Sequence, residues 1–313
     1  MASIQSAELT QLYASWVTKM HENPDMPLEE IRRIFSHWGD VTTEPGGVDY
    51  IEVDAGGVPA MWAIPKGARQ DCALLCSHGG GYVMGSMFSH RKMFAHIAKA
   101  VGCRALIVDY RRAPENPHPG PVNDMVTAYE WLLETERLNP ARIALTGDSA
   151  GGALALTTIA AAREKGLPLP AAAMPMSLWA GLDTSGESYD TNAARDALVS
   201  RDTTNALGAL FIGPAGDPKH PHANPLYIDY HGFPPLYVTV GDAEVLLDDS
   251  RRIADRARAA GVEVKIGQFP DMQHVFQFLA GTAPEADAAI NLMAEWVRPR
   301  LGLGSLPTDR GHL

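Results

Sequence analysis

Residues 143–162, IALTGDSAGGALALTTIAAA, place a serine between a short apolar segment and a run of helix-forming residues. Within this stretch, Gly147-Asp148-Ser149-Ala150-Gly151 matches the pattern G-x-S-x-G. Because the first segment is typical of a buried strand and the second of a helix, the pattern predicts a sharp turn that exposes the serine hydroxyl. The glycines allow the close backbone approach that such a turn requires. We therefore expect Ser149 to be a nucleophile and Asp148 to support it.

A second glycine-rich segment, His78-Gly79-Gly80-Gly81, follows the apolar residues 73–77. Successive backbone amides in such a run can turn toward one point, as stabilisation of a tetrahedral oxyanion requires. We expect the amides of Gly80, Gly81 and Ala150 to be the donors, and His78 to orient the loop. The spacing does not fit the dinucleotide fingerprint G-x-G-x-x-G, which also needs an acidic residue about 20 positions later. No nucleotide site is therefore expected.

Short apolar segments alternate with helical segments along most of the chain. A hairpin is predicted over 48–65, with its turn at Gly56-Gly57. Further strands are expected within 73–78, 104–110, 142–148, 171–180, 235–242 and 262–269, and helices near 90–101, 121–135, 150–164, 248–260 and 284–300. This order predicts the α/β class, with a mostly parallel central sheet and helices on both of its faces.

Two segments fall outside this alternation. Residues 6–38 carry apolar residues at helical spacing on either side of Asn23-Pro24, which predicts two amphipathic helices. Residues 183–233 are too long for a plain connection and contain a helical piece near 202–212. We expect a helical cap over the carboxyl ends of the strands, where α/β sheets bind ligands. The predicted division is a cap from 1–45 and 183–233, a catalytic domain from 46–182 and 234–303, and a tail at 304–313.

Composition excludes several classes of protein. The 313 residues are 46% hydrophobic and 20% charged, as in a globular protein, and the formal net charge of −11 argues against a nucleic-acid partner. The first residues lack a basic segment followed by an apolar run, and no stretch approaches 18 uninterrupted apolar residues, so we expect neither a secretory signal nor a membrane span. The three cysteines, Cys72, Cys76 and Cys103, favour a reduced compartment and hence a cytoplasmic protein.

The serine needs a histidine as its base and an acid behind that histidine. The histidines after Ser149 are His220, His222, His231, His274 and His312. Only His274 directly follows the last predicted strand, whereas His220, His222 and His231 fall in the cap segment, without the ligand spacing of a metal site. The acid is expected after the strand 235–242. Asp248 and Asp249 there are typical of a helix N-terminus, and spacing alone does not separate Asp242 from Glu244.

Taken together, the chain resembles the hormone-sensitive-lipase-like bacterial esterases of the α/β-hydrolase superfamily. The matching stretches are HGGGYVMGS (78–86), VDYRRAPENPHPGPVND (108–124), GDSAGG (147–152), NPLYIDYHGFPPLYVTVGDAEVLLDDS (224–250) and MQHVFQ (272–277). The resemblance implies an α/β-hydrolase fold with a helical cap and no cofactor. It favours Glu244, in Glu244-Val245-Leu246, over Asp242 as the acid. Two residues depart from the family pattern: Arg112 replaces a commoner leucine, and Gln273 replaces a frequent aromatic.

These features predict a serine carboxylesterase that hydrolyses short- to medium-chain acyl esters through an acyl-enzyme. A lactone, including a terpenoid lactone, is the alternative substrate, because ring opening uses the same residues. A non-catalytic small-molecule receptor on this fold is less favoured, because such receptors typically lose the histidine that His274 supplies. A homodimer is compatible with the fold. The sequence leaves the natural substrate, the enantiopreference and the pH optimum open.

Overall fold

The computed structural model describes residues 2–304 and is built around one eight-stranded sheet. The predicted tail lies outside the described residues beyond Gly304. The spatial order of the strands is β1-β2-β4-β3-β5-β6-β7-β8. The strands are β1 (Val48–Asp54), β2 (Pro59–Pro65), β3 (Arg69–Ser77), β4 (Cys103–Val108), β5 (Ile143–Asp148), β6 (Ala172–Met176), β7 (Leu236–Gly241) and β8 (Val264–Phe269).

The sheet is mostly parallel, as the sequence predicts. β2 pairs in antiparallel fashion with β1 and with β4, and the pairs from β4 through β3, β5, β6 and β7 to β8 are parallel. Parallel strands direct their carboxyl ends to the same edge. The residues that follow β3, β5, β7 and β8 therefore meet at one edge of the sheet, and these include the four segments in which the sequence predicts site residues.

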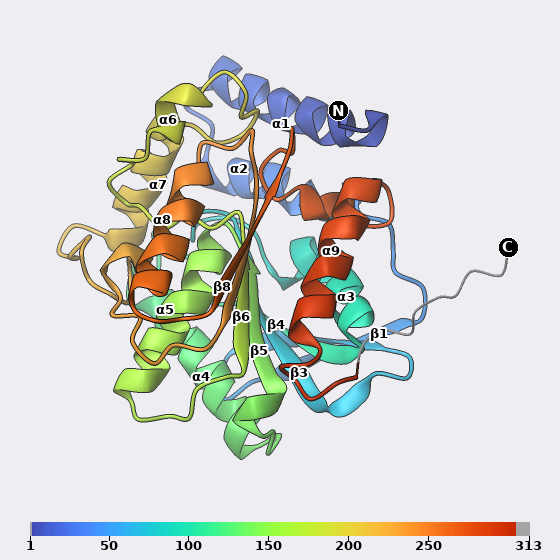
Figure 1. Ribbon diagram of the computed structural model, residues 1–313. Helices are drawn as coiled ribbons and strands as arrows, with labels where there is room; N and C mark the ends of the chain where they lie inside the picture. The colour runs from blue at the N-terminus through green and yellow to red at the C-terminus, as the bar shows by residue number, and fades with distance from the viewer. Residues whose placement is uncertain (1, 305–313) are drawn as a thin grey trace, which may run out of the picture.

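Helices cover both faces of the sheet (Figure 1), with α3 and α9 on one face and α4, α5 and α8 on the other. Alternating strand residues point to opposite faces, so Leu75 and Leu145 pack in one hydrophobic cluster while Leu74 and Ala144 pack in the other. These helices are α3 (Met87–Val101), α4 (Gly120–Glu134), α5 (Ala150–Glu164), α8 (Leu247–Ala259) and α9 (Pro284–Val297).

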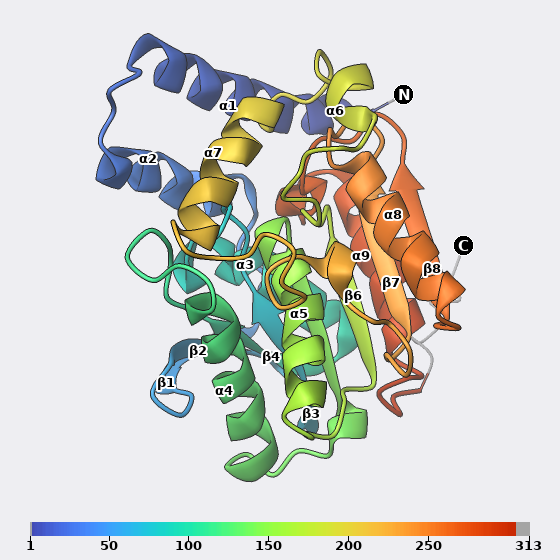
Figure 2. The same ribbon diagram turned by 90° about the vertical axis from the view of Figure 1, so that its left-hand side faces the viewer.

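Four more helices lie together at the carboxyl edge of the sheet. They are α1 (Ile4–Glu22), α2 (Leu28–Phe35), α6 (Ser188–Thr191) and α7 (Arg201–Ile212). Figures 1 and 2 show α1 and α2, from the start of the chain, beside α6 and α7, from its middle. We call these four elements the cap helices. Short 3₁₀ helices complete the structure: η1 (Ser36–Val41), η2 (Pro140–Arg142), η3 (Pro225–Tyr227) and η4 (Phe276–Leu279).

The structure shortens three predicted elements. The second N-terminal helix ends at Phe35 and continues as η1, which contains Trp38. β6 ends at Met176 because Ser177, with φ of 46°, turns the chain out of the sheet. α9 ends at Val297 instead of reaching residue 300, because Pro299 has no amide hydrogen with which to continue the helical hydrogen bonds. All three cysteines are free and buried.

Candidate active site

Ser149 lies on the sharp turn between β5 and α5, with φ of 54° and ψ of −123°. Such a conformation is costly for a residue other than glycine and persists only where the surroundings hold it. Here the Ser149 amide donates to the Met176 carbonyl (2.9 Å), and its carbonyl accepts from the Trp179 amide (3.1 Å). A Cβ atom at Gly147 would collide with the backbone of Gly151, and one at Gly151 with the backbone of Ser77 and His78. The motif glycines are therefore a steric requirement of the turn.

Gly80 and Gly81 follow β3 with φ values of 107° and 62°, which favour glycine. The Gly80 carbonyl accepts from the amides of Val83 (3.1 Å) and Met84 (2.8 Å), which closes a tight turn. Within residues 2–304, the amides of Gly80, Gly81 and Ala150 donate no hydrogen bond to the protein. Ala150 is the first residue of α5, where the amides are also free of helical partners. These three amides are thus available to an external oxygen atom.

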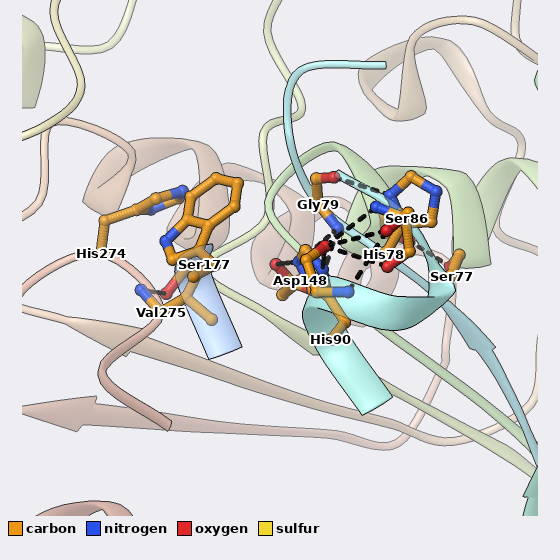
Figure 3. Close-up of polar contacts among 12 residues, drawn as sticks. Ser77, His78, Gly79, Ser86, His90, Asp148, Ser177, His274 and Val275 are labelled. Carbon is orange, nitrogen blue, oxygen red and sulfur yellow. Dashed lines mark hydrogen bonds and ion pairs between the residues drawn. The ribbon is translucent and has the colours of Figure 1, made fainter. Parts of the chain in front are cut away.

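Asp148 and His90 hold the glycine loop in place. The Gly79 amide donates to Asp148 Oδ1 (3.1 Å), and His90 Nε2 lies 3.3 Å from Asp148 Oδ2 (Figure 3). The hydroxyl of Ser89 lies 2.9 Å from His90 Nδ1, so Nδ1 can accept while Nε2 donates to the carboxylate. Asp148 therefore joins the serine turn to the glycine loop. His90 is not among the site residues that the sequence predicts.

His78 stays within its own loop. Its Nδ1 donates to the Gly79 carbonyl (2.8 Å), and its ring stacks on Tyr110 with the ring centroids 4.1 Å apart. Burial, with a smaller contribution from His90, lowers the pKa of His78 well below the ordinary value for histidine. The ring is therefore neutral near pH 7, which suits an orienting residue better than a general acid.

His274 lies in the loop between β8 and η4, and its Nδ1 is 2.9 Å from Glu244 Oε2. Both side chains are buried. Burial alone would lower the pKa of His274, but the hydrogen bond and the charge of Glu244 outweigh it, and the pKa lies above its ordinary value. The geometry leaves Nε2 as the basic nitrogen, because the other ring nitrogen faces the carboxylate.

The alternative acid, Asp242, does not contact His274. Its Oδ1 accepts from Arg195 (2.8 Å) and from the Asp271 amide (2.8 Å) at the surface of the molecule. Glu244 is buried instead, and its Oε1 accepts from the hydroxyl of Ser177 (2.7 Å) and from the Gly241 amide. Of these two carboxylates, only that of Glu244 contacts His274.

The predicted serine, histidine and glycines line one pocket of about 270 Å³. Its remaining walls are almost entirely apolar and come mainly from the cap helices and the neighbouring loops. They include Met20, Leu28, Ile31, Phe35, Trp38, Val83, Met84, Trp179, Leu198, Val199, Leu207, Leu210 and Leu246. Ser149, His274, Gly80 and Gly81 are thus the polar end of an apolar pocket.

Several supporting residues were missed because nothing in their local sequence marks them. Ser177 donates to Glu244 and accepts from the Val275 amide (3.1 Å, Figure 3). Asp196 is partly buried and accepts from the Val245 amide (2.9 Å), next to Glu244. Its partner lies far along the chain, so no periodic pattern links the two. Ser177 is a single polar residue inside the apolar segment 171–180, which by itself marks neither a turn nor a site.

The two residues that depart from the family pattern both make specific contacts. The side chain of Gln273 donates to the Arg195 carbonyl (2.8 Å) and accepts from the Ala197 amide (2.9 Å), which ties the histidine loop to the segment before α7. Arg112 donates to the Gly85 carbonyl (2.9 Å), at the end of the glycine loop.

The three histidines of the 183–233 segment lie away from this pocket. His220 and His222 line a different hollow together with His118, and His231 is exposed beside Asp229. Among residues 2–304, no group of three or more histidine, cysteine or carboxylate side chains is arranged to hold a metal ion. In the same range, no helix is both long and apolar enough to cross a membrane.

Known proteins resemble this chain in sequence. Residues 74–278 match a family model described as the alpha/beta hydrolase fold. An acetyl-hydrolase of Streptomyces hygroscopicus is 39% identical over 268 residues, which is 85% of this chain and 87% of the relative. An esterase of Acinetobacter venetianus is 32% identical over 219 residues, 70% of this chain and 72% of the relative.

Solved structures give the same result at the level of the fold. The crystal structure of an esterase from the bacterial hormone-sensitive lipase family has a TM-score of 0.92 and 41% identity, covering 96% of this chain and all of that one. A hormone-sensitive lipase from a metagenome library has a TM-score of 0.89 and 36% identity, with the same coverage. The chain belongs to the α/β-hydrolase family. Within that family it is a member of the hormone-sensitive-lipase-like bacterial esterases, which are carboxylic-ester hydrolases.

Proposed function

We propose that this protein is a serine carboxylesterase that hydrolyses short- to medium-chain acyl esters, with Ser149 as nucleophile, His274 as base and Glu244 as acid. One observation carries the proposal. Ser149 and His274 line a single pocket together with Gly80 and Gly81, and Glu244 lies directly behind the histidine. A serine, a base with an oriented tautomer and a set of free amides are the groups that acyl transfer needs.

In the proposed mechanism, His274 Nε2 removes the proton from Ser149 while the serine oxygen attacks the ester carbonyl. The amides of Gly80, Gly81 and Ala150 donate to the oxyanion, and each such donor lowers the barrier by roughly 3–4 kcal/mol in related chemistry. His274 then protonates the leaving alcohol, which gives the acyl-enzyme. Water attacks that ester with the same histidine as base, and the acid is released.

The size and polarity of the pocket support small, uncharged substrates. Its volume of about 270 Å³ lies just below the roughly 300–1,000 Å³ typical of small-molecule sites. One relative is named an acetyl-hydrolase, which supports a short acyl group in the substrate. No observation favours a lactone over an open-chain ester, and the retained His274 argues against a non-catalytic receptor. The cytoplasmic location, the homodimer and the division into cap and catalytic domain remain predictions.

The test is hydrolysis of p-nitrophenyl acetate, butyrate, octanoate and palmitate by the wild-type protein and by Ser149→Ala. We expect turnover of the short esters, a steep decline toward palmitate, and a loss of roughly 10⁵- to 10⁶-fold in kcat for the variant. Equal rates for the two proteins would contradict the assignment of Ser149. A folded wild-type protein that leaves all four esters intact would contradict the proposed esterase activity.

A further inference from the structure

Tyr13, in the middle of α1, reaches from the N-terminal part of the cap helices to the backbone of His274. Its hydroxyl donates to the His274 carbonyl (2.9 Å) and accepts from Trp38 Nε1 (3.1 Å). Tyr13 is fully buried, and burial raises its pKa well above the ordinary value for tyrosine. The hydroxyl therefore keeps its proton and remains a donor to the carbonyl.

The peptide group that Tyr13 contacts is held on both sides. Its carbonyl belongs to His274 and accepts from Tyr13, whereas its amide belongs to Val275 and donates to Ser177 Oγ (3.1 Å). Val275 has φ of 50° and ψ of 48°, a left-handed conformation that is unfavourable for a β-branched residue. Such a conformation needs external support, and the two hydrogen bonds supply it next to the catalytic imidazole.

The ring of Trp38 packs the same region from the side of the pocket. It stacks on Phe278, four residues after His274, with the centroids 5.4 Å apart, and it forms a T-shaped pair with the His90 ring, with the centroids 5.5 Å apart. Trp38 also lines the pocket. Tyr13 and Trp38 thus pack against the loop that carries His274, and both side chains are buried.

We propose that Tyr13 is a positioning residue, which holds the peptide after His274 so that the imidazole stays aligned between Glu244 and Ser149. This inference rests on the proposed function, because it assigns Tyr13 a role in the same reaction. Misplacement of a catalytic group lowers the rate of the chemical step more than it weakens substrate binding. Loss of the hydroxyl should therefore reduce kcat and leave KM nearly unchanged.

The test is Tyr13→Phe, which keeps the ring and its packing but removes the hydroxyl. Tyr230→Phe is the matched control, because Tyr230 is also buried and donates to a backbone carbonyl, that of Pro225 (2.9 Å), away from the pocket. Rates with p-nitrophenyl butyrate are referred to the concentration of active serine, titrated with diethyl p-nitrophenyl phosphate. We expect Tyr13→Phe to lose about 10-fold in kcat with KM within about twofold of wild type, and Tyr230→Phe to match wild type on both.

Two results would overturn the role of Tyr13 while leaving the esterase intact. In the first, Tyr13→Phe keeps the full kcat although Ser149→Ala is inactive. In the second, Tyr13→Phe and Tyr230→Phe lose kcat equally, which would reveal a general effect of a lost buried hydroxyl. Failure of the wild-type protein to hydrolyse any ester would instead overturn the proposed function, and the role of Tyr13 with it.

Discussion

The carboxylate of Glu244 accepts from three donors, namely the hydroxyl of Ser177, the Gly241 amide and the His274 ring. These contacts fix a negative charge in a buried place, where its effect on a neighbouring group is strong. Burial raises the pKa of Glu244, and the hydrogen bonds from its donors partly offset that rise. The charge in turn raises the pKa of His274, despite the opposite effect of burial.

This arrangement predicts the pH dependence of the reaction. His274 can act as a base only when it is neutral, and its raised pKa means that kcat/KM should increase with pH through a midpoint above that of ordinary histidine. In Glu244→Gln the charge is gone, so the midpoint should move to lower pH while the plateau falls by roughly 10²- to 10⁴-fold. A series of kcat/KM values from pH 5 to pH 9 measures both effects.

Asp242→Asn is the matched control for this series, because it removes the other candidate carboxylate and its contact with Arg195. That contact is at the surface, where an ion pair contributes little to the free energy of unfolding. The control should keep the midpoint and the plateau of the wild type. If Asp242→Asn were the variant that lost the plateau, Glu244 could not be the acid.

For single residues, the sequence predicts those that belong to a motif. It does not predict the residues that hold the motif residues in place. Ser149 and the glycines follow from local patterns, and Glu244 was favoured over Asp242 only through the resemblance. Ser177, His90 and Tyr13 act across the fold on partners such as Glu244, Asp148 and His274. Their contacts depend on how distant segments pack, which no local spacing encodes.

Among the elements, α5 lies close against β3 where it starts at the serine turn. A Cβ atom at Gly151 would meet the carbonyl oxygens of Ser77 and His78, which are backbone atoms and cannot rotate away. Gly151→Ala should therefore force β3 and α5 apart at a cost of about 3 kcal/mol. We expect the thermal midpoint to fall by roughly 5 °C or more, together with a loss of esterase activity.

Gly46→Ala provides the comparison, because Gly46 has open space around it and no left-handed conformation. Its stability should change by no more than about 0.5 kcal/mol. Thermal unfolding followed by circular dichroism measures both variants. A Gly151→Ala protein with the stability of wild type would mean that the serine turn has more room than the backbone contacts indicate.

The strands and helices of the sheet layers were predictable because short apolar segments alternate regularly with segments of helical pattern. The strands expected within 104–110 and 142–148 form β4 and β5, with ends that differ by one or two residues. The errors occur where the chain changes direction. Neither the 3₁₀ helix η1 nor the turn at Ser177 is visible in the hydrophobic pattern, since both depend on contacts with the folded core.

For the whole molecule, the main feature is a pocket whose polar end belongs to the sheet and whose walls belong largely to the cap helices. Leu207, on α7, lines this pocket opposite Gly81. Leu207→Ala should enlarge the pocket beside Gly81, and each additional methylene of the acyl chain that is buried there contributes about 0.8 kcal/mol of burial free energy. We expect the ratio of kcat/KM for p-nitrophenyl octanoate to that for acetate to rise several-fold.

Leu292→Ala is a suitable control, because Leu292 is a partly exposed leucine on α9 and does not line the pocket. Its ratio of octanoate to acetate rates should equal that of the wild type. An unchanged ratio in Leu207→Ala would show that long acyl chains do not enter along α7.

Trp38 both lines the pocket and contacts the residues around His274. Leu28, Ile31 and Leu210 supply wall area, so mutational drift at these positions would alter substrate range without disturbing the chemistry. Trp38 is part of the same wall, yet it also donates to Tyr13 and stacks beside the histidine loop. On the role proposed for Tyr13, exchanges at the aliphatic positions are expected to change specificity alone, whereas an exchange at Trp38 is expected to change specificity and to lower kcat as well.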